Sequence, residues 1–283
     1  MTAYLNALGV ICALGRDKHT VAHNLFAGDC SGVRIKDGWV AERALPVAAV
    51  PGELAPIPPT LLAHRSRNNQ LLLEAGLQIR AEIDQAIQAY GRARIGIVLG
   101  TSTSGIDEAS QGIAHYLREQ HFPDGYDYQQ QELSAPANFL SDWLGLSGPS
   151  YVISTACTSS ARALMSARRL LDLGLCDAVL CGGVDSLCKL TLNGFFPHWK
   201  RCRTNAAIRF SVNRSGINIG EAAVLFLMSK TPGDGTPIAL LGDGASSDAH
   251  HISAPEPSGR GARQAMEKKP CVALASRPAR STT

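Results

Sequence analysis

The segment from Ser150 to Gly183 constrains the fold of this chain more than any other stretch. It begins with the β-rich run SYVIS, passes through the hydroxyl-rich joint TACTSS, continues as the helical pattern ARALMSARRLLDLG and ends in the apolar run DAVLCGG. The pattern predicts a strand, a helix and a second strand, and strands joined in this way run parallel in one sheet. The residues expected to point largely inward are Leu164, Met165, Ala167, Leu171 and Leu173, and those expected to point outward are Arg162, Arg168 and Arg169.

Other apolar runs extend this sheet. RIGIVLG, at residues 94–100, is continuous and ends in glycine, which is typical of a central strand buried on both faces. GINIGEAAVLFLMSK at 216–230 and TPIALLGDG at 236–244 each predict one more strand. The expected fold class is therefore α/β, with layers of helices on a mostly parallel sheet.

The connections carry weaker signals. Residues 41–59 predict a proline-punctuated excursion, and residues 60–90 predict one helix or two abutting helices that end at Gly91. Gly28 should close an earlier helix in the same way. TSTSG, at residues 101–105, is expected to cap a helix, because it lacks the Gly-x-x-x-x-Gly-Lys spacing of a phosphate-binding loop.

Composition excludes several classes of protein. The chain has 283 residues, of which 45% are hydrophobic and 18% are charged, as in soluble α/β proteins. Its net charge of +3 comes from scattered lysines and arginines, so we expect no nucleic acid partner. The first residues carry neither a basic region nor a long apolar run, which predicts no export signal, no membrane span and a cytoplasmic location. Eight irregularly spaced cysteines without a C-x-x-C pair predict reduced, mostly buried thiols and no metal site.

Cys157 lies where the first strand of the βαβ segment meets its helix. A side chain at such a joint is held at the carboxyl edge of the sheet, where ligands bind, and the free amides of the helix start stabilise a thiolate. The small neighbours Ala156, Ser159, Ser160 and Ala161 leave room for a substrate carbonyl. The residues alone leave two interpretations open, a nucleophile or a buried structural cysteine.

A nucleophilic thiol needs an acid or base partner, which is normally a histidine. No histidine of this chain shows a spacing that identifies it as that partner. His250 and His251 lie in a loop rich in Ser, Pro and Gly, where we expect them to bond backbone groups or water. The other candidates are His198, His115, His121, His64, His19 and His23.

TACTSSARAL resembles the active-site segment of the elongating β-ketoacyl-[acyl carrier protein] synthases, the KAS I and KAS II types of the thiolase superfamily. The likeness continues in ALGVICALG, GIVLGTSTSG and DAVLCGGVDSL. FSVNRSGINIGEAAVLFL is similar to the family pattern F-x-x-x-R-x-G-x-x-x-G-E, with Arg214, Gly216, Gly220 and Glu221 in place. The resemblance implies a thiolase-like layered αβαβα fold, of which this chain holds mainly the N-terminal half.

Functional assignments follow from this resemblance. Cys157 is the implied catalytic nucleophile that accepts an acyl chain, and Phe195, in the segment NGF, is an implied substrate-binding residue of the acyl pocket. No bound cofactor and no metal are implied, because the substrate is presented on the phosphopantetheine of an acyl carrier protein. That carrier is the implied partner, together with a second copy of the chain or a hetero-partner.

The resemblance also divides the chain. Residues 1–241 are similar to the N-terminal synthase domain and 242–266 to the start of the C-terminal half, whereas 267–283 form an aberrant or disordered tail. The family's two catalytic histidines and its lysine are not found after Met266. The charged stretch 197–208 also departs from the family, and we hypothesise that frame changes produced both departures.

The implied function is that of a 3-oxoacyl-[acyl carrier protein] synthase of fatty-acid or polyketide synthesis, by decarboxylative Claisen condensation with a malonyl carrier. Without the histidines, condensation should be slower by several orders of magnitude. One alternative is a non-catalytic, carrier-binding or chain-length-factor-like partner, or a degenerate product. Another is a cysteine hydrolase that pairs Cys157 with His250 or His251.

Overall fold

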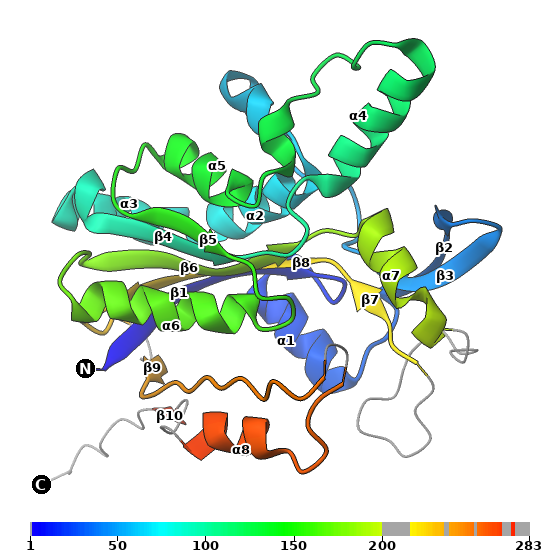
Figure 1. Ribbon diagram of the computed structural model, residues 1–283. Coiled ribbons are helices and arrows are strands. Elements are labelled where there is room, and N and C mark those ends of the chain that lie inside the picture. Colours follow the sequence, from blue (N-terminus) through cyan, green and yellow to red (C-terminus); the bar gives the residue numbers. More distant parts are fainter. Residues whose placement is uncertain (1, 200–215, 235–237, 252–253, 268–272, 275–283) are drawn as a thin grey trace, which may run out of the picture.

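The computed structural model describes residues 2–199, 216–234, 238–251, 254–267 and 273–274. Its main element is a seven-stranded sheet in the order β10-β9-β1-β8-β6-β4-β5, with helices on both faces (Figure 1). Its strands are β1 (Ala3–Cys12), β4 (Ile95–Gly100), β5 (Ser150–Ile153), β6 (Ala178–Asp185), β8 (Ala222–Ser229), β9 (Ile238–Leu240) and β10 (Ala273–Leu274).

A smaller three-stranded sheet and the helices complete the described part of the chain. The small sheet consists of β2 (Val33–Val40), β3 (Arg43–Ala48) and β7 (Ile219–Gly220). The α-helices are α1 (Lys18–Ala27), α2 (Arg67–Gln78), α3 (Arg80–Tyr90), α4 (Ile106–Glu119), α5 (Ala135–Leu144), α6 (Ser159–Asp172), α7 (Lys189–Trp199) and α8 (Arg260–Glu267). The 3₁₀ turns are η1 (Pro59–His64), η2 (Arg92–Arg94) and η3 (Tyr128–Gln131). Within the described ranges, no helix has the length and apolar character that crossing a membrane requires.

Two hydrophobic cores hold helices against opposite faces of the large sheet. On one face, α2, α3 and α5 pack on the sheet through buried leucines and isoleucines (Figure 1). On the other face, α6 packs on β4 and β6 through small residues such as Ala163 and Ala167. Along β4, Ile97 and Leu99 belong to the first core and Val98 to the second. This strand is therefore buried on both faces, as predicted.

The predicted βαβ segment is confirmed as β5, α6 and β6. Both strands pair parallel with β4, which lies between them. Two side chains do not point as expected. Leu173 is exposed, because it lies just past the end of α6. Arg168 is largely buried, because its guanidinium forms an ion pair with Asp243 at 2.8 Å.

Strand directions differ from the predicted mostly parallel sheet. Among the described strand pairs of the large sheet, β4–β5 and β4–β6 are parallel, whereas β8 runs antiparallel to both β6 and β1. β9 also runs antiparallel to β1 and to β10. The layered α/β class is confirmed, but the expectation of mostly parallel pairing is wrong. β8 lies between β1 and β6, and its two faces contact the two hydrophobic cores. Its residues are apolar because of this burial, which a parallel or an antiparallel strand would experience equally, so an apolar run does not indicate strand direction.

Two connecting stretches add detail to the sequence pattern. Residues 41–59 contain β3, which pairs antiparallel with β2 and was not predicted, because Pro46 within it is unusual for a strand. Residues 60–90 form a 3₁₀ turn and two helices with a break at Ile79, and Gly91 ends the second helix as predicted.

The proposed division at residues 241 and 266 stays a prediction. The stretch 267–283 lies largely outside the described residues, and so does 197–208.

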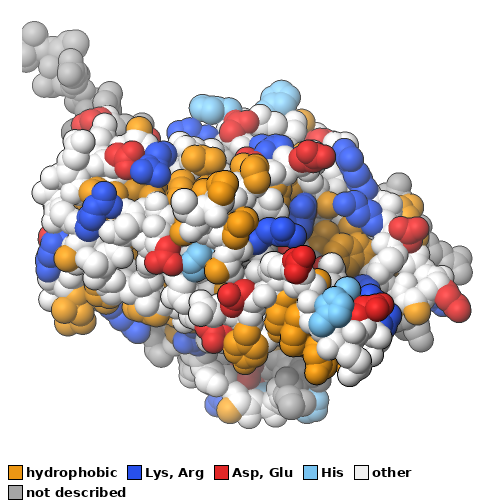
Figure 2. Space-filling view, turned by 90° about the horizontal axis from the view of Figure 1, so that it is seen from above, with side chains coloured by type: hydrophobic (Ala, Val, Ile, Leu, Met, Phe, Trp, Pro, Cys, Tyr) orange, Lys and Arg blue, Asp and Glu red, His pale blue; other side chains and the backbone are white. Residues whose placement is uncertain are grey.

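On the face that carries α2, α3, α4 and α5, acidic and basic side chains alternate without a continuous basic area (Figure 2).

Candidate active site

Cys157 lies in the turn between β5 and α6. This turn lies at the edge of the large sheet where β4 and β6 end (Figure 1). Its side chain is exposed and lines a pocket of about 290 Å³. The ends of β4 and β6 and the start of β8 also line this pocket, through residues such as Gly100, Gly183, Asp185 and Ala222. Because β4 and β6 are parallel, their carboxyl ends meet at this edge, where α/β proteins bind ligands.

The hydroxyl-rich joint holds its own backbone in a tight turn. Ser159 Oγ accepts a hydrogen bond from Thr155 N at 2.8 Å and donates one to Ala156 O at 2.6 Å. Thr158 Oγ1 donates to Thr155 O at 2.9 Å, a local bond from a side chain to the backbone that is typical of such turns. Ala156 adopts a left-handed conformation, with a φ of 52°, directly before the cysteine. These contacts hold Cys157 at the start of α6.

Two glycines allow the start of α6 to lie directly on the sheet. A Cβ atom on Gly100 would lie 2.4 Å from Ser160 N, and one on Gly183 would lie 2.6 Å from Ser160 Cβ. Residues with a side chain would push the helix away from the strand ends at both positions. The first turn of α6 therefore borders the Cys157 pocket, and the Ser159 amide in this turn donates to Ala156 O at 3.0 Å.

Asp185, the last residue of β6, organises another wall of the pocket. Its Oδ1 accepts hydrogen bonds from Ser102 N at 2.7 Å, Thr103 Oγ1 at 2.9 Å and Thr101 Oγ1 at 3.1 Å. The segment TSTSG thus has a structural role, but the expected helix capping is wrong, because α4 begins after Gly105 without a side-chain cap. The sequence analysis missed Asp185, although an acidic residue at the end of a buried strand was an available signal.

One family model matches most of the chain. It describes the N-terminal domain of β-ketoacyl synthases and matches residues 6–232. The chain belongs to the β-ketoacyl synthase family. The matched range includes the Cys157 joint and the loop that Asp185 holds, so the resemblance inferred from the motifs is confirmed.

Curated synthases that are similar in sequence are longer than this chain. The chloroplastic 3-oxoacyl-[acyl-carrier-protein] synthase II of Arabidopsis thaliana is 26% identical over 288 aligned positions, which cover 93% of this chain and 52% of that protein. The 3-oxoacyl-[acyl-carrier-protein] synthase 2 of Rhizobium meliloti is 25% identical, over 77% of this chain and 53% of that protein. The chain spans about half the length of the curated relatives it matches.

Solved synthase structures share the fold. A chain in the complex of the ketosynthase ApeO with its chain length factor ApeC, from Xenorhabdus doucetiae, is 42% identical with a TM-score of 0.86. The match covers 94% of this chain and 67% of that one. A β-ketoacyl synthase from Burkholderia phymatum has a TM-score of 0.80 at 22% identity, over 94% of this chain and 69% of that one. The expected layered fold of an N-terminal synthase half is therefore confirmed.

The other predicted site residues do not line the Cys157 pocket of this synthase domain. Phe195 lies on α7 and is 39% exposed, but it is not a lining residue. None of the described histidines lines the pocket either. His64 Nε2 instead lies 2.8 Å from Asp142 Oδ2, and the ring of His115 packs against a second histidine. The catalytic role of Cys157 and the substrate-binding role of Phe195 stay predictions.

The cysteines of the synthase domain differ in exposure. The six described cysteines form no disulfide. Three of them are buried, whereas we expected most of the thiols to be buried. Burial raises the pKa of Cys176 and of Cys181, which keeps these thiols protonated near neutral pH. Cys30 and Cys157 are exposed. No group of three or more His, Cys, Asp or Glu residues in the described ranges is placed to hold a metal ion.

Glu221, from the F-x-x-x-R-x-G-x-x-x-G-E motif, has a structural role. Its carboxylate is fully buried and accepts hydrogen bonds from Arg67 Nε at 2.7 Å and from Val50 N at 3.0 Å. The hydrogen bond to Glu221 raises the pKa of Arg67. Gly216 of the same motif has a φ of 78°, which favours glycine, and Arg214 lies outside the described residues. The motif therefore joins the start of β8 to α2 and to the end of β3.

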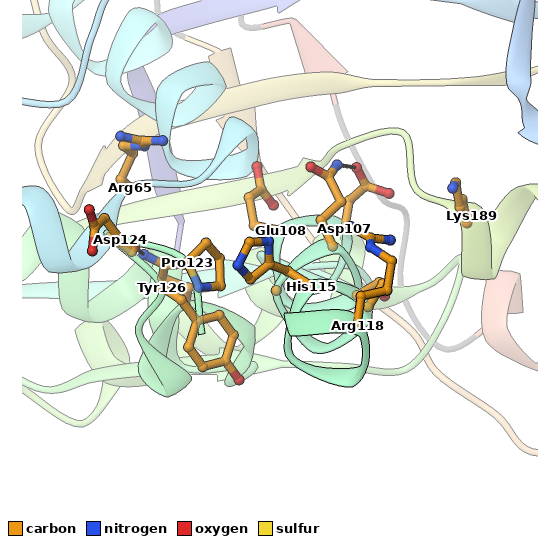
Figure 3. A pocket seen from close by; sticks show the side chains of 15 residues that line it. Arg65, Asp107, Glu108, His115, Arg118, Pro123, Asp124, Tyr126 and Lys189 are labelled. Carbon is orange, nitrogen blue, oxygen red and sulfur yellow. Dashed lines mark hydrogen bonds between the residues drawn. The ribbon is translucent and has the colours of Figure 1, made fainter. Parts of the chain in front are cut away.

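A second pocket, of about 670 Å³, lies beside α4 and shares no lining residue with the first (Figure 3). Glu108 lines it, and one of its oxygens accepts a hydrogen bond from Arg67 N at 2.6 Å. Burial raises the pKa of Glu108 above its ordinary value, because the hydrogen bond and nearby cation offset only part of the desolvation.

We expect Glu108 to make the free energy of unfolding depend on pH. A carboxyl whose pKa is raised by folding binds its proton more tightly in the folded state. Its stabilising contribution is present below the unfolded pKa and is lost as the pH rises through the folded pKa. The native protein should therefore lose stability relative to Glu108→Gln as the pH rises from about 4. Urea denaturation of both proteins across this range measures the difference, and parallel pH profiles would contradict the prediction.

Proposed function

We propose that this chain carries the acyl-accepting cysteine of a β-ketoacyl synthase, with Cys157 as the nucleophile. The observation that carries the proposal is the exposed Cys157 thiol in a pocket where β4, β6 and α6 meet. Membership of the synthase family and the segment TACTSSARAL support the same role. The proposed substrate is an acyl thioester on the phosphopantetheine of an acyl carrier protein, and no bound cofactor takes part.

Acyl transfer to the cysteine is the proposed first step. The Cys157 thiolate attacks the carbonyl carbon of the thioester, and a new carbon–sulfur bond forms. The bond between that carbon and the carrier sulfur then breaks, and the carrier leaves as a thiolate that takes up a proton. The oxyanion formed in between would be stabilised by amides in the first turn of α6 other than that of Ser159, which donates to Ala156 O.

Condensation is the proposed second step. A malonyl carrier loses carbon dioxide, and the resulting carbanion attacks the thioester on Cys157, which releases the Cys157 thiolate and a 3-oxoacyl carrier. In the resembled synthases two histidines stabilise the intermediate enolate. No histidine in the described ranges lines the Cys157 pocket, so the residues described here support acyl transfer more directly than condensation.

A non-catalytic, carrier-binding partner is the second candidate. One similar structure is that of a ketosynthase in complex with its chain length factor, which makes a hetero-partner or a second copy of this chain a relevant assembly. The thiol of Cys157 favours the enzyme, because a partner without chemistry has no need of it. A cysteine hydrolase is disfavoured, since neither His250 nor His251 lines the pocket.

Intact-mass analysis of the full chain, after incubation with an acyl-carrier thioester, tests the proposed function. We expect one acyl adduct per chain, mapped to Cys157 by peptide analysis, with release of free carrier thiol. Subsequent addition of a malonyl carrier distinguishes the two steps, because condensation removes the adduct as a 3-oxoacyl product. An adduct spread evenly over the exposed cysteines, or no adduct, would count against the enzyme.

A further inference from the structure

The pocket beside α4 has the size and lining of a small-molecule site. Its volume of about 670 Å³ lies within the usual range of such sites, and α4 and the segment 123–126 form its walls. Arg65, just before α2, and Lys189, at the start of α7, stand at its opposite ends (Figure 3). One stripe of α4 supplies five polar side chains, those of Asp107, Glu108, Gln111, His115 and Arg118.

Three lining residues carry a buried acceptor atom without a hydrogen-bond partner among the described residues. These atoms are Asp107 Oδ1, Glu108 Oε2 and His115 Nε2. The other oxygens of the two acids are engaged, since Asp107 Oδ2 accepts from Gln111 Nε2 at 2.7 Å and Glu108 Oε1 accepts from Arg67 N. With its ring proton on Nδ1, His115 offers Nε2 as an acceptor. Buried acceptor atoms nearly always have a hydrogen-bond donor. These three atoms are therefore suited to a ligand that supplies hydrogen-bond donors.

Basic side chains around the same pocket also lack partners. Arg65, Arg118 and Lys189 line it, and within the described residues none of them makes a side-chain hydrogen bond or ion pair. Asp107, Glu108 and Asp124 line the same pocket, yet the acids and the bases do not form ion pairs with each other. Both signs of charge are therefore available to one ligand.

We propose that this pocket binds a small zwitterion, an aliphatic amine that also bears a carboxylate or a phosphate. Its ammonium group brings three N–H donors, the same number as the unsatisfied acceptor atoms on Asp107, Glu108 and His115. Its anionic group meets Arg118, which lies on the same stripe of α4 as His115 (Figure 3). A ligand with only an anionic group would face three acids, and a ligand with only an ammonium group would leave Arg118 without a partner.

Calorimetric titration of the full chain with β-alanine and with phosphoethanolamine tests this site and distinguishes a carboxylate from a phosphate. We expect saturable binding of at least one of them, and binding weaker by about tenfold or more in Glu108→Gln and in Arg118→Gln. Glu108→Gln keeps an acceptor for Arg67 N. The matched control is Glu119→Gln, because Glu119 lies exposed on the same helix outside the pocket.

Three results would overturn the proposal. The first is that neither probe binds saturably, and the second is that both pocket variants keep the native affinity. The third is that ethylammonium or inorganic phosphate alone binds as tightly as the zwitterion. If Glu108→Gln does not fold, the exposed Arg118→Gln carries the test. The zwitterion should bind equally to Cys157→Ser, because the two pockets share no residue, so this result is independent of acyl transfer.

Discussion

Replacing Cys157 by serine is expected to lower the rate of acyl transfer from a carrier thioester by about 10³-fold or more. No described histidine lines this pocket, so neither side chain has a base beside it. A serine hydroxyl depends on such a base more than a thiol does, because a thiol is more acidic and its thiolate is intrinsically the stronger nucleophile. Because Cys157 is exposed, the substitution leaves the hydrophobic cores unchanged. The measurement is the initial rate at which the acylated chain forms in intact-mass spectra at a fixed carrier concentration.

Cys30→Ser is the matched control for this experiment. Cys30 is also an exposed, free cysteine, but it does not line the Cys157 pocket. We expect Cys30→Ser to be acylated at the rate of the native chain. Equal loss in the two variants, or retention in both, would show that Cys157 is not the acyl acceptor. Thermal melting of both variants verifies that they are folded.

Replacing Glu221 by alanine is expected to lower the free energy of unfolding by about 3 kcal/mol. The substitution leaves the Arg67 guanidinium without its counter-charge and the Val50 amide without its acceptor. Removing one partner of a buried pair is costly, because the other group keeps its desolvation penalty. The Arg67 side chain is 36% exposed, so solvent screens part of its unpaired charge in the variant. The expected loss of stability therefore lies at the low end of the range for buried pairs.

Asp84→Ala provides the comparison for an exposed ion pair. Asp84 lies four residues after Arg80 on α3, with an Nε–Oδ2 distance of 3.0 Å, and both side chains are more than 40% exposed. Solvent screening limits its expected effect to about 0.5 kcal/mol or less. Urea denaturation measures both variants through their midpoints and slopes. Similar losses for Glu221→Ala and Asp84→Ala would contradict the structural role of the buried pair.

The elements that hold Cys157 were predictable because their signals are local. Apolar residues at short intervals define β4 and α6. Helix ends elsewhere in the chain were predictable for the same reason: Gly28 ends α1 and Gly91 ends α3, and both glycines have a positive φ. The joint around Cys157 also depends on contacts between residues at most four positions apart, such as Thr155 N with Ser159 Oγ. The same short segment carries the motif that led to the family.

Contacts between distant segments decided the rest of the site. Asp185 binds a loop more than 80 positions earlier in the chain, and Glu221 binds Arg67 across 154 positions. The direction of β8 and the polar pocket beside α4 depend in the same way on segments that approach only after folding. Periodicity and helix capping report on a few neighbouring residues. The partner of a buried carboxylate and the direction of a central strand depend instead on which remote segments the packed cores bring together, and only the tertiary structure supplies that information.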